Sequence, residues 1–301
     1  MSAAGFAYGN ARVRAMRSRL LRPEDGFALR AASSLAALAA GLGAPPPASA
    51  RLFRRELFDG LMRDYRRVIG SYPRGGDLFA ALLGLHEIEN WKLLWRALVR
   101  RVPPARWTPL WRPLGRLEAL GLDDARAAAS LSEAAALAKE TAYEPGVADA
   151  LRAPEGDLAA AERAFDRFAS RRLAAEARRL PRREQAARDL ALALVRERDV
   201  RAVQQATASG EAPGEARLAA AVFREEPPGD PAASMAALLQ RRRAACRSAF
   251  LGPPLRLAPA VACLLLREEE TRALSALAEA CGRPVPAEVL DRALRASALA
   301  G

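Results

Sequence analysis

Residues Pro253 to Leu294 read PPLRLAPAVACLLLREEETRALSALAEACGRPVPAEVLDRAL. This stretch predicts one helix, a break marked by proline, and the start of a second helix. Because the charged block Arg267 to Arg272 places opposite charges at neighbouring helical positions, we expect it to face solvent or a partner. The apolar residues of the first helix recur mostly three, four and seven positions apart, as on one buried face: Leu257, Val261, Leu264, Leu265, Leu274 and Leu277.

The composition of the whole chain agrees with a helical protein. The chain has 301 residues, of which 51% are hydrophobic and only 6% aromatic, and Ala and Leu dominate the apolar fraction. β-Branched residues are sparse, and no alternating strand pattern of useful length is present. A chain of this size buries roughly 75% of its extended surface, which is enough for a large core or for two or three smaller ones. We therefore predict an all-α protein.

The chain is strongly basic, with a formal net charge of +12. Lys92 and Lys139 are the only lysines, so arginine supplies nearly all of the positive charge. The arginines are spread along the chain, as expected for solvated helix faces. An acidic partner surface, anionic lipid headgroups or a nucleic acid would also suit this charge.

The three cysteines, Cys246, Cys263 and Cys281, are far apart in the sequence. Their spacing fits neither a metal site nor a redox motif, and the N-terminus lacks the apolar core of a signal peptide. We therefore expect buried, reduced thiols in a cytoplasmic protein. The longest apolar run, Leu257 to Leu266, is too short to span a bilayer, so we expect no direct membrane span.

Glycine and proline clusters divide the chain into about a dozen helices. One of these, Arg51 to Ile69, carries a broad apolar stripe. The predicted breaks are 41–48, 72–76, 102–113, 144–146, 154–156, 209–214, 226–231, 252–254 and 282–286.

A weak internal repetition runs along the chain. Three predicted helices carry an acidic residue near their start, then apolar positions, then arginine. The three copies are Glu87 to Arg96, Asp189 to Arg198 and Glu268 to Arg272. Their separation would suit three stacked subdomains of several helices each.

Three segments of the chain have a recognisable order of residues: Tyr8 to Leu21, Glu87 to Arg96 and Pro253 to Leu294. Together they resemble the component of V-type and A-type rotary ATPases that is called C in bacteria and archaea and d in eukaryotes. The N-terminal run from Tyr8 to Leu21 is similar to the opening of that family, with Arg12 and Arg14 in the Ala-Arg-x-Arg-Ala pattern. Glu87 to Arg96 is similar to a family helix that carries an acidic residue, Asn, Lys and Arg. The C-terminal stretch is similar to the family's Pro-rich entry, Leu-rich helix and acidic core. The residues that match the family motifs are Tyr8, Arg12, Arg14, Glu87, Asn90, Lys92, Arg96, Pro259, Glu268, Glu270 and Arg272.

The resemblance implies a funnel-shaped, all-helical body of three similar subdomains in a pseudo-threefold arrangement, for which we expect boundaries near 1–115, 116–210 and 211–301. It implies a non-catalytic socket of the central rotor, which couples the stalk subunits D and F to the membrane proteolipid ring during proton or sodium transport. It also implies a peripheral position on the inner face of the cell membrane, with no cofactor, metal or nucleic acid bound.

The sequence departs from the family in its second and third copies. The middle copy has no Asn-x-Lys, and in the last copy Ala273 stands where Asn is frequent, Ser275 where a basic residue is usual and Cys263 where Tyr is common. These changes make the third copy less polar than its relatives.

The side chains of the first copy suggest a structural role. A buried Asn90 that both donates and accepts would fix one helix against another, because leaving it unpaired costs about 1–3 kcal/mol. We expect Asn90 and Glu87 to lock subdomain packing, and Lys92 and Arg96 to pair with acidic groups elsewhere. A solvated polar face is the alternative.

Other patterns favour structure over chemistry. Trp91 and Trp95, like Trp107 and Trp111, are four apart, which fits core packing better than base stacking. His86 is the only histidine and lacks the partners of a triad or a zinc site.

Asp123 and Asp124 are best explained as helix caps, and no Gly-rich phosphate loop is present. Two other function classes remain open: a basic helical nucleic-acid-binding or scaffold protein, and a helical enzyme.

Overall fold

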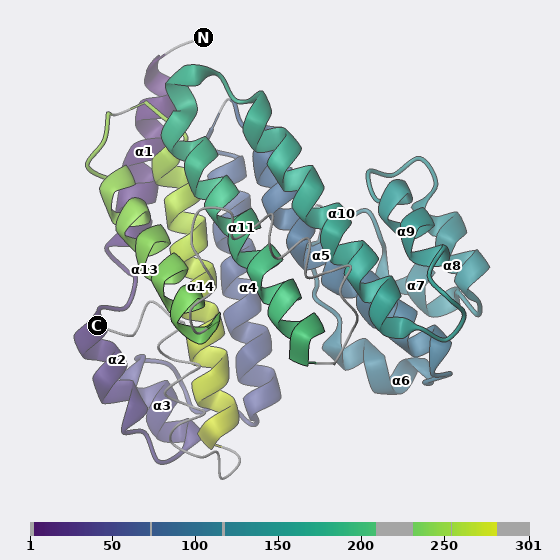
Figure 1. Cartoon of the computed structure of the whole chain (residues 1–301). Helices are drawn as coiled ribbons and strands as arrows, with labels where there is room; N and C mark the ends of the chain where they lie inside the picture. Colours follow the sequence, from purple (N-terminus) through teal and green to yellow (C-terminus); the bar gives the residue numbers. More distant parts are fainter. Residues whose placement is uncertain (1–2, 73, 116–117, 209–230, 254, 282–301) are drawn as a thin grey trace. The chain divides into compact units, whose positions relative to one another are not determined.

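The computed structural model describes residues 3–72, 74–115, 118–208, 231–253 and 255–281. Within these residues the chain forms thirteen α-helices and two short 3-10 helices, and it has no strand (Figure 1). The prediction of an all-α fold is confirmed for this part of the chain. The predicted breaks at 209–214 and 282–286, and the helix expected after 286, lie outside the described residues, as does most of the break at 226–231.

The chain divides into two compact units. Unit 1 comprises Met1–Gly76, Leu180–Ala193 and Pro228–Gly301, and unit 2 comprises Asp77–Arg179 and Leu194–Pro227. Helix α11 (Gln185–Ala208) contributes residues to both units.

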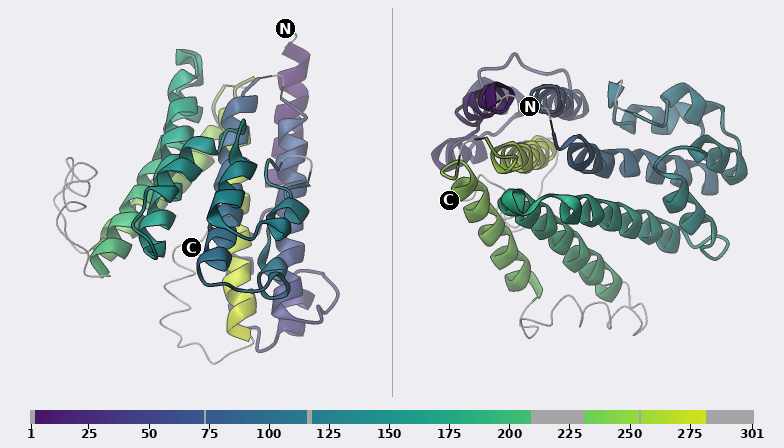
Figure 2. Two further views of the ribbon diagram at one scale, coloured as in Figure 1. Left: turned by 90° about the vertical axis from the view of Figure 1, so that its right-hand side faces the viewer. Right: turned by 90° about the horizontal axis from the view of Figure 1, so that it is seen from above.

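Unit 1 is built around α14 (Ala258–Cys281), most of whose residues are buried. Helix α14 lies between α13 (Pro231–Ala249) on one side and α1 (Ala3–Arg17) and α4 (Ala50–Ile69) on the other (Figure 2). The predicted apolar positions of α14 are buried, but so are residues on its other faces. The prediction of a single buried face is therefore too narrow, because neighbouring helices cover α14 on several sides.

Two short helices, α2 (Pro23–Arg30) and α3 (Leu35–Gly41), close the end of α14. Serine side chains define the starts of two helices here, since Ser34 Oγ accepts from Ala37 N at 3.1 Å and Ser49 Oγ accepts from Leu52 N at 3.2 Å. A buried apolar cluster joins α2, α3, α4 and α14: Leu29, Leu38, Ala39, Phe53, Ala273, Leu274, Leu277 and Ala278.

Unit 2 contains two long helices, α5 (Gly76–Val99) and α10 (Leu158–Arg179). Trp95 of α5 packs edge-to-face on Phe165 of α10, with ring centroids 5.4 Å apart. The remaining elements are short: α6 (Pro104–Trp107), η1 (Thr108–Leu110), α7 (Leu122–Ala127), α8 (Leu131–Ala138) and α9 (Glu144–Leu151).

Two predicted breaks in unit 2 are helical. The break predicted at 144–146 is wrong, because α9 begins at Glu144 and Pro145 occupies its first turn, where proline fits. The break predicted at 102–113 contains α6 and η1, again with proline at their starts. Proline in these segments begins helices instead of excluding them.

No described helix combines the length and the apolar character that a bilayer crossing requires.

Candidate functional site

The four motif residues of α5 are all anchored inside unit 2. Asn90 is 1% exposed; its Nδ2 donates to Arg112 O at 2.8 Å, and its Oδ1 accepts from Arg112 N at 2.9 Å. Glu87 is 2% exposed and accepts backbone N–H groups from Ala119 at 2.5 Å and Leu120 at 2.8 Å. The predicted pair therefore acts together. It holds the segment after η1 onto α5. That Asn90 and Glu87 lock the packing of subdomains stays a prediction.

Tyr143 lies close enough to Glu87 for the carboxylate to act on its phenol. The guanidinium carbon of Arg172 lies 5.0 Å from the centroid of the Tyr143 ring. Burial, with the Glu87 carboxylate, raises the pKa of Tyr143 above its ordinary value, so the phenol remains neutral. The solvated polar face considered for Glu87 and Asn90 is excluded.

Lys92 and Arg96 clamp α5 to α10. Lys92 Nζ lies 2.6 Å from Asp166 Oδ1 and 3.1 Å from Glu89 Oε1, and Arg96 grips Glu162 with Nε at 2.5 Å and Nη2 at 2.9 Å. The prediction that both cations pair with acids elsewhere is confirmed. We call this set the α5–α10 clamp: Glu89, Lys92, Arg96, Glu162, Asp166 and Arg198.

The electrostatics of the clamp favour its ionised form. Burial alone would raise the pKa of Glu89, but Lys92, Arg112 and Arg198 together lower it. The hydrogen bond from Arg96 to Glu162 raises the pKa of Arg96. Glu89 and Arg96 therefore both carry their charges at neutral pH.

The three glutamates of the charged block of α14 are buried, which contradicts the expected solvated or partner-facing side for them, whereas Arg267 is half-buried and Arg272 is exposed. Glu268, Glu269 and Glu270 are 7%, 1% and 3% exposed. Glu268 accepts from the Tyr65 hydroxyl of α4, and Arg267 Nε donates to Asp64 of α4 at 2.8 Å. These buried charges are tolerated inside unit 1 because side chains of neighbouring helices form hydrogen bonds or ion pairs with them.

Glu269 has the most enclosed set of partners. It accepts from Arg242 and from Arg243 Nε, the latter at 2.9 Å, and all three side chains are at most 6% exposed. We call these residues the α13–α14 triad. Burial and the Glu268 carboxylate raise the pKa of Tyr65, so this phenol also remains a neutral donor.

Three buried glutamates, Glu87, Glu184 and Glu270, have the same kind of hydrogen-bond partner. Each carboxylate accepts a backbone N–H one or two residues before a helix begins, where that N–H has no partner within the helix. Glu184 was not singled out from the sequence, although it lies in the acidic and basic run that precedes the middle copy. The pairs are Glu87 with Leu120 before α7, Glu184 with Leu257 before α14 at 2.8 Å, and Glu270 with Leu21 before α2 at 2.6 Å.

Of the remaining motif residues, those on α1 and Arg272 are more accessible than the buried glutamates. Tyr8 is 58% exposed on α1, and Arg14 is exposed on the same helix. The Arg12 guanidinium lies over the Tyr8 ring at 5.2 Å and donates to Ser71 Oγ at 3.0 Å. Arg272 reaches back along α14 to Glu268. Pro259 is buried in the first turn of α14.

The structure also places the other residues singled out from the sequence. All four tryptophans are buried, which confirms core packing. Cys246 and Cys263 are buried free thiols whose pKa burial raises to about 12, while Cys281 is only half-buried. His86 is half-buried on α5.

The helix-cap prediction for Asp123 and Asp124 is wrong in detail. Gly121 is the N-cap of α7, and both carboxylates lie in the first turn, near the positive end of the helix dipole. Among the described residues, no three His, Cys, Asp or Glu side chains gather as metal ligands would.

The acidic half of the α5–α10 clamp could have been found in the sequence. Lys92 and Arg96 are four residues apart on α5, and Glu162 and Asp166 are four apart on α10. Two such complementary pairs meet when the helices run antiparallel, with the first cation on the second acid. The observed pairing follows this order.

Comparison with known families identifies the family of the chain. The family model described as ATP synthase (C/AC39) subunit matches residues 9–208, which is most of the chain. A comparison with curated protein sequences finds no match. The chain therefore belongs to the ATP synthase (C/AC39) subunit family, whose members are non-catalytic components of the central rotor in V-type and A-type ATPases.

Proposed function

We propose that this protein is the socket of the rotor, which couples the central-stalk subunits D and F to the membrane proteolipid ring. Through it, ATP hydrolysis or synthesis is linked to the transport of protons or sodium ions. The protein would lie peripherally on the cytoplasmic face of the membrane, as part of the ATPase complex.

The observation that carries the proposal is the inward direction of the motif charges. A coupling part transmits torque only if its helices do not slide past one another. The α5–α10 clamp and the α13–α14 triad tie neighbouring helices together at several points within each unit. The charged motif residues of α5 and the glutamates of α14 hold neighbouring helices together, so we do not assign partner contact to them.

Partner contact is assigned instead to the outward face of α1. Tyr8 and Arg14 are exposed there, and Tyr and Arg are the side chains that most often anchor protein interfaces. Arg12 supports the Tyr8 ring from one side. Of the motif residues, Tyr8, Arg12 and Arg14 therefore form the proposed contact, and Arg272 remains a candidate at the edge of α14.

Internal repetition supports a pseudo-threefold body. The three motif copies lie on α5, α11 and α14, and each of these helices is 24 residues long. The three glutamates that accept N–H groups before α7, α14 and α2 add a second shared feature. We propose three related subdomains, near 1–115, 116–210 and 211–301, that form a funnel around the foot of the stalk.

Reconstitution from purified parts tests this function. The 301-residue chain would be mixed at low salt with the D and F subunits and, separately, with the detergent-solubilised proteolipid ring. We expect it to co-elute with both in size-exclusion chromatography. Elution apart from both would overturn the coupling role. A gel shift with generic duplex DNA serves as the control, since a +12 protein that only binds polyanions would shift it with a steep salt dependence.

A further inference from the structure

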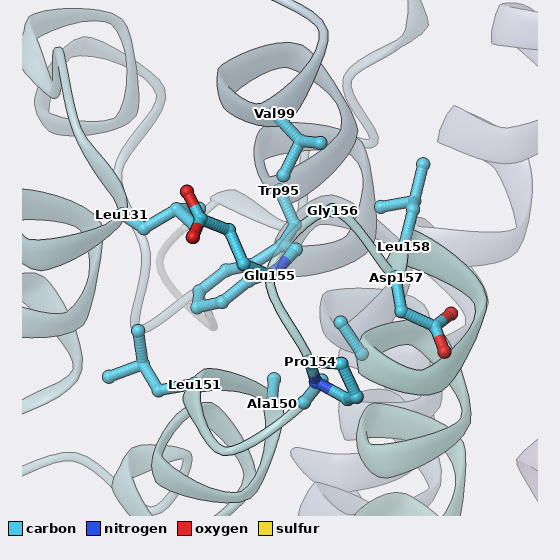
Figure 3. A pocket seen from close by; sticks show the side chains of 12 residues that line it. Trp95, Val99, Leu131, Ala150, Leu151, Pro154, Glu155, Gly156, Asp157 and Leu158 are labelled. Carbon is cyan, nitrogen blue, oxygen red and sulfur yellow. The ribbon is translucent and has the colours of Figure 1, made fainter.

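Unit 2 contains an apolar pocket that the coupling function does not use. Its volume is about 200 Å3, and it lies between α5, α8, α9, the start of α10 and the connection from α9 to α10 (Figure 3). The Trp95 ring lies across its centre, with Leu131 and Leu151 on one side and Leu158 on the other. A cavity of ~150 Å3 with an apolar lining holds benzene, so this one has room for an aliphatic side chain.

The floor of the pocket is rigid. Trp95, Ala150 and Ala161 are each 2% exposed, and the Trp95 ring is fixed by its edge-to-face contact with Phe165. A preformed apolar floor binds an apolar group without ordering costs of its own.

The rim of the pocket is acidic in a basic protein. The lining includes the exposed carboxylates Glu155 and Asp157 but no Lys or Arg. Asp157 Oδ1 accepts from Ala160 N at 2.8 Å, and no described residue forms an ion pair with either carboxylate. The two carboxylates lie on opposite sides of the Trp95 ring in Figure 3. The rim therefore attracts cations although the chain as a whole repels them.

The rim also offers apolar contact outside the cavity. Leu151 is 46% exposed, and Pro154 is exposed beside it. Gly156 has a positive φ of 79°, which fixes the turn that carries both carboxylates. An occupant that fills the cavity and also covers this rim is larger than a small apolar molecule.

The geometry points to a docking pocket for a segment of another polypeptide, in which an aliphatic side chain fills the cavity and a flanking Arg or Lys meets Glu155 and Asp157. The apolar side chain provides the anchor, and the rim charges select basic neighbours. This inference is independent of the coupling role, because it concerns neither α1 nor the motif residues.

Binding of designed peptides to the 301-residue chain tests the pocket. The probe is a labelled pentapeptide with leucine at its centre and arginine at the other positions, measured by fluorescence anisotropy. Two matched peptides carry alanine at the centre or glutamate at the flanks. We expect saturable binding of the first peptide and at least tenfold weaker binding of both others. Equal binding of the alanine peptide, or no saturable binding of the leucine peptide at millimolar concentration, overturns the proposal.

Two variants locate the binding. Glu155→Arg should weaken binding of the leucine peptide at least tenfold, whereas Asp123→Arg makes the same charge change at a side chain that is 97% exposed and outside the pocket lining, and should leave binding unchanged. Ala153→Trp should block the pocket, with thermal unfolding used to check the fold. Equal effects of Glu155→Arg and Asp123→Arg, or binding of free indole in the pocket without binding of the peptide, would count against a peptide site.

Discussion

Helices α5 and α14 each carry one of the predicted motif copies but use their charges in opposite ways. On α5 the cations Lys92 and Arg96 reach out to acids on α10 that are partly exposed. On α14 the acid Glu269 receives two arginines from α13 in a fully buried site. In both helices the motif copy lies where the helix forms ion pairs with a neighbouring helix. The neighbouring residues determine whether the motif contributes the cation or the anion, and how exposed the ion pair is to solvent.

The largest expected effect is the removal of the buried carboxylate. Glu269→Ala leaves Arg242 and Arg243 close together in the core, and losing one partner of a buried ion pair costs about 3–5 kcal/mol. Since total stability is about 5–15 kcal/mol, we expect a large drop in the urea midpoint measured by circular dichroism.

Glu279→Ala on the same helix is the matched control. Its ion pair with Arg54 is about 40% exposed at both side chains, so the loss should stay below about 1 kcal/mol. If both variants lost a similar free energy of unfolding, the α13–α14 triad would not be more stabilising than the exposed ion pair of Glu279 with Arg54.

Asn90→Ala should have the next largest effect. It removes both hydrogen bonds to the Arg112 backbone inside unit 2, at an expected cost of about 1–3 kcal/mol. Hydrogen exchange gives a local measure, because the Arg112 amide should lose protection while the Trp111 amide, bonded to Thr108 O at 3.0 Å, should keep its own. Unchanged melting temperature together with unchanged Arg112 protection would exclude the anchoring role.

The two cations of the α5–α10 clamp should contribute unequally to the free energy of unfolding. Lys92 is 8% exposed and Arg96 is 39% exposed at the side chain, so Lys92→Met should cost about 1.5 kcal/mol and Arg96→Met less than about 1 kcal/mol. A double-mutant cycle between Lys92 and Asp166 measures their coupling. A larger cost for Arg96→Met would reverse this ranking.

Acid should weaken the same clamp through Glu89. Its pKa is lower in the folded protein than the ordinary value of 4.5, so the unfolded chain takes up the proton first as the pH falls. The stabilisation is present above about pH 4.5 and is lost below it. Because Lys92 is one cause of the lowered pKa, stability measured in urea at several pH values should depend less on pH in Lys92→Met than in the wild type.

The sequence predicted the helices and the α5 motif better than the environment of α14. Periodicity located the apolar positions of α14 and α4 because a helical face repeats every three to four residues. It could not show that the Glu268–Glu270 block is buried, since that depends on Tyr65 and Arg242, which lie far away in the chain.

Sequence patterns were also insufficient for the connecting segments and for the buried glutamates that bind backbone N–H groups. The start of α9 was missed because Pro145 was interpreted as a break when it stands in a first helical turn. Glu184 was missed because its partner is a single backbone N–H at Leu257, and such a contact leaves no spacing pattern in the sequence. Complementary four-residue spacings, as on α5 and α10, are the kind of tertiary contact that a sequence can reveal.

The smallest effect on stability is expected at Tyr8. Its side chain is 58% exposed, so Tyr8→Ala should change the free energy of unfolding by about 0.5 kcal/mol or less. If α1 contacts the stalk or the ring, the same change should weaken co-elution with that partner at least tenfold, because an exposed Tyr beside Arg12 is a typical interface anchor.

Leu110→Ala is the control for Tyr8→Ala, since Leu110 is 53% exposed and lies outside the family motifs. A stable Tyr8→Ala protein that still assembles like the wild type would remove α1 from the proposed interface. That result would not affect the role of the α5–α10 clamp and the α13–α14 triad in stiffness, because neither includes Tyr8. Tyr8→Ala, which should barely affect folding, therefore tests whether partner contact lies on the exposed face of α1 and not at the ion pairs of the α5–α10 clamp and the α13–α14 triad.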